Sequence, residues 1–192
     1  MKKIINLLLI ITVVLSAFAF TNPKKEKVAI KESTILWKGK KVIGSSHSGT
    51  IDLKEGYFEI EDDLFVGGEF VIDMKSIAVT DLENENYKLK LEKHLKNSDF
   101  FDVNKFPTAT LIINGVGQLT KERNYEVHGT LTIKGISNPI VFNISSEDRT
   151  ATAHLDIDRS KFNVKYNSKS FFKNLGDKAI ADIFELNITL KY

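Results

Sequence analysis

The sequence predicts an all-β domain of about eight to ten antiparallel strands with one helix among them. Apolar and polar residues alternate along most of the chain, as at Ala151, Ala153, Leu155 and Ile157. A period of two residues is typical of strands with one buried face. Turn signals such as Asn114-Gly115 separate the runs. Strands of this kind bury their apolar faces in a two-sheet sandwich or a closed barrel.

The strands are predicted from two groups of segments. Six segments alternate strictly, and three earlier segments are β-like with weaker alternation. The strictly alternating segments are 70–74, 109–113, 131–133, 140–144, 151–157 and 184–190, and the earlier ones are 35–42, 47–53 and 57–60.

One helix, over about residues 81–97, interrupts the strands. Thr80 and Glu83 have the spacing of a capping box, which begins a helix. The helical period then places Tyr87, Leu91, His94 and Leu95 on one face. We expect this face to pack on the strands and to cover one end of a barrel.

Composition narrows the classes of function. The chain has 192 residues, 42% hydrophobic and 27% charged, which suits one globular domain and disfavours disorder. Its formal net charge of +2 is low for a nucleic-acid binder, so no nucleic-acid partner is expected. The absence of cysteine excludes disulfides, thiolate metal sites and thiol nucleophiles.

The N-terminus has the pattern of a secretory signal peptide. A positive start, Met1–Lys3, precedes an apolar stretch and a small-residue site that ends at Ala19. We expect cleavage near Ala19 and a periplasmic or secreted protein; a single membrane anchor is the alternative. Residues 1–19 are thus interpreted as signal peptide, 20–33 as a flexible extension, and 34–192 as a single domain.

Several short motifs recur in an order that is typical of one family. They lie between Trp37 and Tyr192, and no single one is decisive. They are Trp37-Lys38-Gly39, Gly44–Thr50, Gly67–Met74, His94–Val103 followed by Phe106–Thr110, His128–Ile136, and Arg159 before Phe162. On these motifs the chain resembles the YceI-like family of secreted, lipocalin-like barrels.

The resemblance implies an antiparallel, lipocalin-like β-barrel of about eight strands. Its apolar tunnel would take a long polyisoprenoid or quinone-like amphiphile, without a cofactor. It further implies a periplasmic or secreted location, a link to stress responses and no established catalysis. The leading hypothesis is therefore a non-catalytic carrier or sequestering protein for an apolar lipid.

Residues of the lipid site are assigned from alternation and from the helical face. Inward branched and aromatic side chains would form the wall, and the helix with the segment after it would close one end. The candidates are Trp37, Phe70, Ile72, Met74, Tyr87, Leu91, His94, Leu95, Phe100, Phe101, Leu111, Ile113, Leu131, Ile133, Phe142, Phe184 and Leu186. The same residues could instead fill the barrel, which would then be an interaction module for a membrane or periplasmic protein.

A basic loop suggests a second contact. Phe171 and Phe172 lie among Lys161, Lys165, Lys169, Lys173 and Lys178, a composition that can dock transiently on an anionic membrane surface. The alternative is a solvated loop with the phenylalanine pair tucked inward. A homodimer is left open.

Enzymatic function has the weakest support. The four histidines form no zinc motif, and no nucleophile elbow or phosphate-binding loop is present. A hydrolase or isomerase would need His94 or His47 as a base in the pocket. His94 is otherwise interpreted as a histidine under the helix, hydrogen-bonded to backbone. Arg159 is interpreted as structural, pairing with a carboxylate or capping strand ends; the alternative is contact with the polar head of a ligand.

Overall fold

The computed structural model describes residues 24–120 and 123–192, so the predicted signal peptide lies outside the described residues. Nine strands, one α-helix and two short 3-10 helices follow one another in the described part. They are β1 (Glu26–Ala29), β2 (Glu32–Lys40), β3 (Ser46–Glu61), β4 (Leu64–Val79), α1 (Glu85–Lys96), β5 (Thr108–Thr120), β6 (Asn124–Ile133), β7 (Ile136–Glu147), β8 (Thr150–Asp158), η1 (Arg159–Phe162), η2 (Gly176–Lys178) and β9 (Ile183–Lys191).

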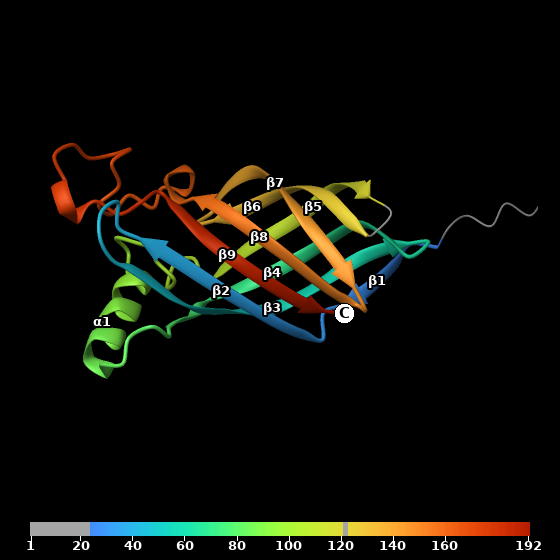
Figure 1. The fold of residues 1–192 in the computed structure, drawn as a ribbon, viewed down its shortest axis with the longest axis horizontal. Coiled ribbons are helices and arrows are strands. Elements are labelled where there is room, and N and C mark those ends of the chain that lie inside the picture. Colours follow the sequence, from blue (N-terminus) through green and yellow to red (C-terminus); the bar gives the residue numbers. More distant parts are fainter. Residues whose placement is uncertain (1–23, 121–122) are drawn as a thin grey trace, which may run out of the picture.

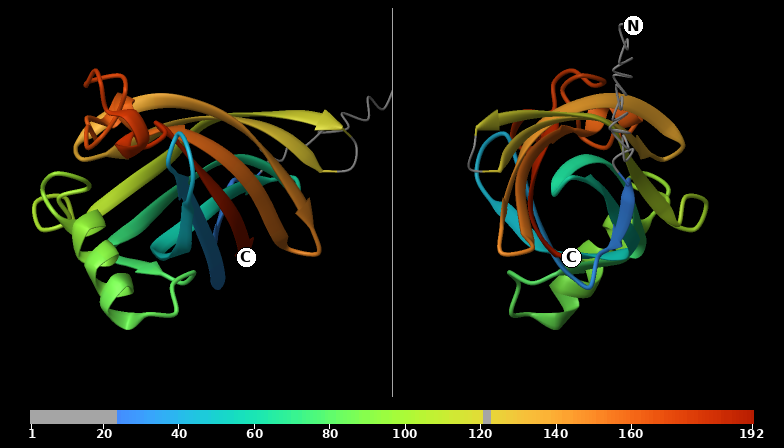
Figure 2. Two further views of the ribbon diagram at one scale, coloured as in Figure 1. Left: turned by 60° about the vertical axis from the view of Figure 1, so that its left-hand side comes forward. Right: turned by 90° about the vertical axis from the view of Figure 1, so that its right-hand side faces the viewer.

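The strands form a closed antiparallel barrel, which confirms the predicted fold class. Strands β2 to β9 form the ring, in which each pairs with two ring neighbours, and the β3–β4 ladder closes it; β3 also pairs with β1. β1 and β2 lie on the same side of β3, β1 opposite Tyr57–Ile60 and β2 opposite Ser46–Thr50. The right-hand view of Figure 2 looks along the barrel and shows the strands as a ring.

Two predicted boundaries were wrong. Part of the segment expected to be flexible, 20–33, forms β1, since Val28 can pack on the aromatic core behind it. The helix begins later than residue 81: Asn84 caps it, its side chain accepting from the N–H groups of Asn86 and Tyr87. Thr80 does not cap the helix, because it lies four residues before Asn84; its N–H, which a capping box would pair with the Glu83 side chain, is bonded to the Ser48 carbonyl of β3.

A cluster of aromatic rings fills the end of the barrel opposite α1. Phe58 and Phe65 stack with ring centroids 4.3 Å apart, and Phe70, Tyr125 and Tyr192 surround them. All five are at most 5% exposed. Stacked and edge-on ring pairs stabilise this cluster beyond the burial of their surface. The five rings close this end of the barrel.

Helix α1 and the chain after β8 cover the other end of the barrel (Figure 1). Arg159, only 2% exposed, organises this region by donating to the carbonyls of Val164, Tyr166, Ile180 and Ala181. Five fixed N–H donors suit such a cluster of acceptors. The structural interpretation of Arg159 is confirmed.

Asp182 is the carboxylate partner of Arg159, whose Nη2 lies 3.4 Å from the Asp182 Oδ1. Burial alone would raise the pKa of Asp182. Hydrogen bonds from Ser168 and Ser170 and the charge of Arg159 outweigh that effect, so the pKa is held below its usual range.

The described residues contain no helix with the length and hydropathy needed to cross a bilayer.

Candidate functional site

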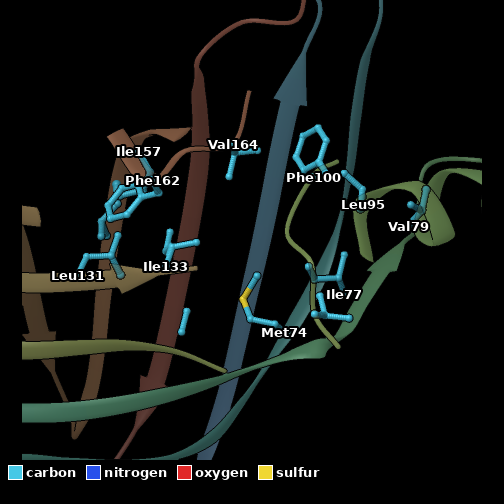
Figure 3. Packing of buried hydrophobic residues seen from close by; sticks show 13 residues of the cluster. Met74, Ile77, Val79, Leu95, Phe100, Leu131, Ile133, Ile157, Phe162 and Val164 are labelled. Carbon is cyan, nitrogen blue, oxygen red and sulfur yellow. The ribbon is translucent and has the colours of Figure 1, made fainter. Parts of the chain in front are cut away.

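An apolar cavity of about 180 Å³ lies inside the barrel between its two covered ends. Inward side chains from both halves of the ring form its wall. Figure 3 shows the helix end of this interior, where Met74, Leu131 and Ile133 project from the strands and Phe100 and Leu95 lie opposite them.

Most of the predicted lipid-site residues meet in this cavity. The alternation therefore identified the inward face of each strand on which it was applied. The predicted residues that line the cavity are Trp37, Phe70, Ile72, Met74, Leu95, Phe100, Phe101, Leu111, Ile113, Leu131, Ile133, Phe142, Phe184 and Leu186.

The cavity offers a ligand almost no polar contact. The Trp37 indole N–H donates to the carbonyls of Thr50 and Ala78, at 3.1 Å each. Among the described lining residues the charged one is Arg159, whose N–H groups bind backbone carbonyls. An apolar cavity of about 150 Å³ stays dry and binds a small hydrocarbon. This larger one therefore suits an apolar chain better than water.

Three predicted site residues lie elsewhere, which corrects the assignment of the helical face. Tyr87, Leu91 and His94 line an open groove between α1 and the segments that carry Tyr166 and Ile180. Tyr87 is 66% exposed, and Leu95 is the buried residue of α1. The later start of the helix leaves Tyr87 in its first turn, beyond the edge of the barrel.

His94 is not bonded to backbone as expected. Its Nδ1 lies 3.6 Å from the Asp99 Oδ2, and its ring meets Tyr166 edge-on with centroids 4.4 Å apart. Its Nε2 is buried and has no hydrogen-bond partner in the described part of the chain. His94 therefore connects α1 to the segments around it and does not reach the cavity.

The sequence prediction missed several cavity residues. Ile35 and Leu155 lie in segments that were predicted as strands, Leu155 among the strictly alternating residues, but neither was assigned to the lipid site. Ala109, in the strictly alternating segment 109–113, also lines the cavity and was not assigned to the site. Ile180 and Ala181 carry no periodic signal, because an isolated bridge to Lys41 and the hydrogen bonds of Arg159 place them.

The basic loop exposes its aromatic pair. Phe171 and Phe172 are 42% and 48% exposed, so the alternative interpretation, in which the pair is tucked inward, is wrong. The Lys165 ammonium lies 5.2 Å from the centroid of the Phe171 ring. The loop projects from the same end of the barrel as α1 (Figure 1).

Known proteins match the chain in sequence and in fold. A UPF0312 protein of Pseudomonas putida (strain W619) is 28% identical over 94 residues, 49% of this chain and 46% of that protein. The match thus spans less than half of the length of this curated relative.

Two solved structures share the fold. BcnA of Burkholderia cenocepacia has a TM-score of 0.58 at 21% identity, covering 82% of this chain and 94% of that one. A polyisoprenoid binding domain from Saccharophagus degradans, implicated in plant cell wall breakdown, has a TM-score of 0.57 at 13% identity, covering 88% and 97%. The sequence profile of the YceI-like domain matches residues 27–192, and the chain therefore belongs to the YceI-like family.

Proposed function

We propose that this protein is a non-catalytic carrier that holds one long apolar lipid chain, of polyisoprenoid or quinone-like type, inside its barrel. The observation that carries the proposal is the internal cavity, which is apolar and enclosed along a barrel sealed by aromatic rings at one end. The name of the S. degradans domain suggests the ligand class. A secreted or periplasmic location and a role in stress response belong to the same proposal.

The cavity favours a single chain over a compact ligand. Its volume of about 180 Å³ is close to the ~150 Å³ that holds one small hydrocarbon, so it takes one or two isoprene units as it stands, and a longer chain must displace lining side chains. Its lining extends from Phe58 and Phe70 at the aromatic end to Phe101 and Ala181 at the helix end. Each buried methylene contributes about 0.8 kcal/mol, so a chain of several isoprene units offsets the entropic cost of association.

The exposed aromatic pair supports a transient membrane contact during lipid exchange. Phe171 and Phe172 lie next to the exposed side chains of Lys169 and Lys173. Aromatic rings insert at the headgroup level while lysines attract anionic lipid. We expect the double variant Phe171→Ser/Phe172→Ser to lose binding to anionic vesicles but to keep lipid affinity, and a double variant that retains vesicle binding would contradict this role.

The lipid site is tested by the fluorescence of Trp37, the one tryptophan of the chain and a cavity-lining residue. Delipidated protein is titrated with geraniol, farnesol and geranylgeraniol, while displacement of N-phenyl-1-naphthylamine is followed in parallel. We expect Trp37 emission to change and the affinity to rise more than tenfold per added isoprene unit. Burial of five more carbons contributes at most about 4 kcal/mol, which is the upper bound on the gain in binding free energy per isoprene unit. No Trp37 response and no displacement by any of the three alcohols would refute the carrier function.

A further inference from the structure

The wall of the barrel is incomplete between β7 and β8. Hydrogen-bonded pairing between them covers only Ile144–Glu147 and Thr150–Ala153. Both strands continue beyond this ladder, β7 back to Ile136 and β8 on to Asp158, and each remains paired with its other neighbour there. We call the unpaired stretch, 139–143 against 154–158, the seam. Figure 1 shows that β7 and β8 lie close together at the hairpin that joins them and diverge with distance from it.

A surface hollow of about 800 Å³ lies over the seam and is lined from both strands. Four of its lining residues, Phe142, Ala153, Leu155 and Ile188, also line the internal cavity. Phe142 and Ile140 are only partly buried although they point inward, whereas Ile144, where pairing resumes, is 5% exposed. The seam is therefore the place where a thin layer of side chains separates the cavity from the outside.

Both ends of the seam are fixed. The ladder at Ile144 and Ala153 closes its narrow end. At the other end the Asn138 side-chain amide donates to the Lys161 carbonyl of η1, at 3.0 Å. The seam is thus a slot bounded at both ends.

The rim of the seam is polar and lacks a strong cation. His154 Nδ1 lies 2.9 Å from the Asn187 Oδ1, and its Nε2 lies 3.6 Å from the Asp156 Oδ1. Asn143, Ser145, Thr152 and Thr189 complete the polar lining, and no lysine or arginine is among the described residues that line this hollow. A carboxylate without a nearby lysine or arginine disfavours an anionic headgroup, while amides and hydroxyls can hydrogen-bond a neutral one.

We propose that the seam is the lateral mouth of the lipid cavity: the apolar chain passes between Phe142 and Leu155, and an uncharged, hydrogen-bonding headgroup stays on the polar rim. This inference rests on the proposed function, since it assigns the entry route and headgroup class of the same site. Entry from the ends would need larger changes. The aromatic cluster closes one end, and the hydrogen bonds of Arg159 fix the chain over the other.

Bridging the seam tests the entry route. The chain has no cysteine, so the pair Val141→Cys/Asp156→Cys can be linked selectively with a reducible bis-methanethiosulfonate. Continuing the β7–β8 register places these two residues opposite one another. The matched control is Ile112→Cys/Thr130→Cys, a pair within the closed β5–β6 ladder, bridged in the same way. Circular dichroism melts verify that both bridged proteins are folded.

We expect the seam bridge to slow uptake and release of geranylgeraniol at least tenfold, as followed by Trp37 fluorescence, and reduction to restore both rates. The control bridge leaves the rates unchanged. Normal rates in the bridged seam variant, with equilibrium binding intact, would overturn the lateral mouth while leaving the carrier function standing. Absence of geranylgeraniol binding even in the unmodified protein would refute both.

The headgroup class is tested by comparing the affinities of two ligands that share one isoprenoid tail and differ in their headgroup. Geranylgeraniol should bind at least tenfold more tightly than geranylgeranyl phosphate, and Asp156→Asn/His154→Gln should reduce this preference without affecting the melting temperature. Equal or tighter binding of the phosphate would overturn the neutral-headgroup assignment.

Discussion

Filling the cavity from Ala109 distinguishes a hollow barrel from a packed one. Ala109, 5% exposed, lies opposite Ile72 in the β4–β5 ladder and lines the cavity. Ala109→Leu adds three carbons, which contribute about 2 kcal/mol if they enter free apolar space. In a packed interior the same substitution would instead cost ~1–3 kcal/mol through strain. We therefore expect the delipidated variant to be as stable as the wild type or up to about 2 kcal/mol more stable.

The same change should weaken lipid binding, because the new side chain takes space that the ligand needs. The assay combines urea unfolding of delipidated protein with displacement of N-phenyl-1-naphthylamine by geranylgeraniol. Thr110→Leu, on the same strand but with its side chain on the other face, is the control and should leave the lipid affinity unchanged. A loss of more than 1 kcal/mol in Ala109→Leu, or unchanged lipid affinity, would refute the hollow barrel.

Three further predictions concern the helix end. Arg159→Lys should lower the free energy of unfolding in urea by about 3 kcal/mol, because lysine cannot satisfy the four carbonyls that the guanidinium binds. The same change at exposed Arg123 should have little effect, and equal effects of the two changes would contradict the role of Arg159. The pKa of Asp182 is depressed in the folded protein, so its stabilising contribution is present above its unfolded pKa of about 3.9 and is lost as the pH falls through its lower folded pKa. In thermal melts between pH 7 and pH 3, Asp182→Asn should therefore lose less stability on acidification than the wild type. An identical loss of stability would argue against the pairing. Lys134→Met should lower the free energy of unfolding by ~1–3 kcal/mol and weaken lipid binding, because the Lys134 ammonium donates to the Phe100 carbonyl at 2.6 Å and Phe100 lines the cavity. A variant with unchanged urea unfolding and unchanged displacement of N-phenyl-1-naphthylamine by geranylgeraniol would contradict this.

The barrel and most of its interior were predictable because strand alternation is a local property. On β6, Leu131 and Ile133 point inward while Thr130 and Thr132 face outward, as the period of two requires. The resemblance supplied the choice of barrel over sandwich, which periodicity alone left open.

The errors arose where non-local contacts determine the structure. Thr80 is a good cap in sequence, but its N–H belongs to a sheet contact with Ser48 that no local pattern shows. Tyr87 satisfies the helical period yet extends past the barrel, because the helix starts at Glu85. The seam was equally inaccessible, since β8 alternates in the same way whether or not β7 pairs with it.

Native mass spectrometry of the protein purified from its own host, followed by organic extraction, tests the central claim most directly. The carrier account predicts one long-chain lipid per protein chain, with a neutral headgroup, or stoichiometric uptake of geranylgeraniol by protein that arrives empty. A bare protein mass that stays unchanged when polyisoprenoid alcohols and quinones are offered would contradict it.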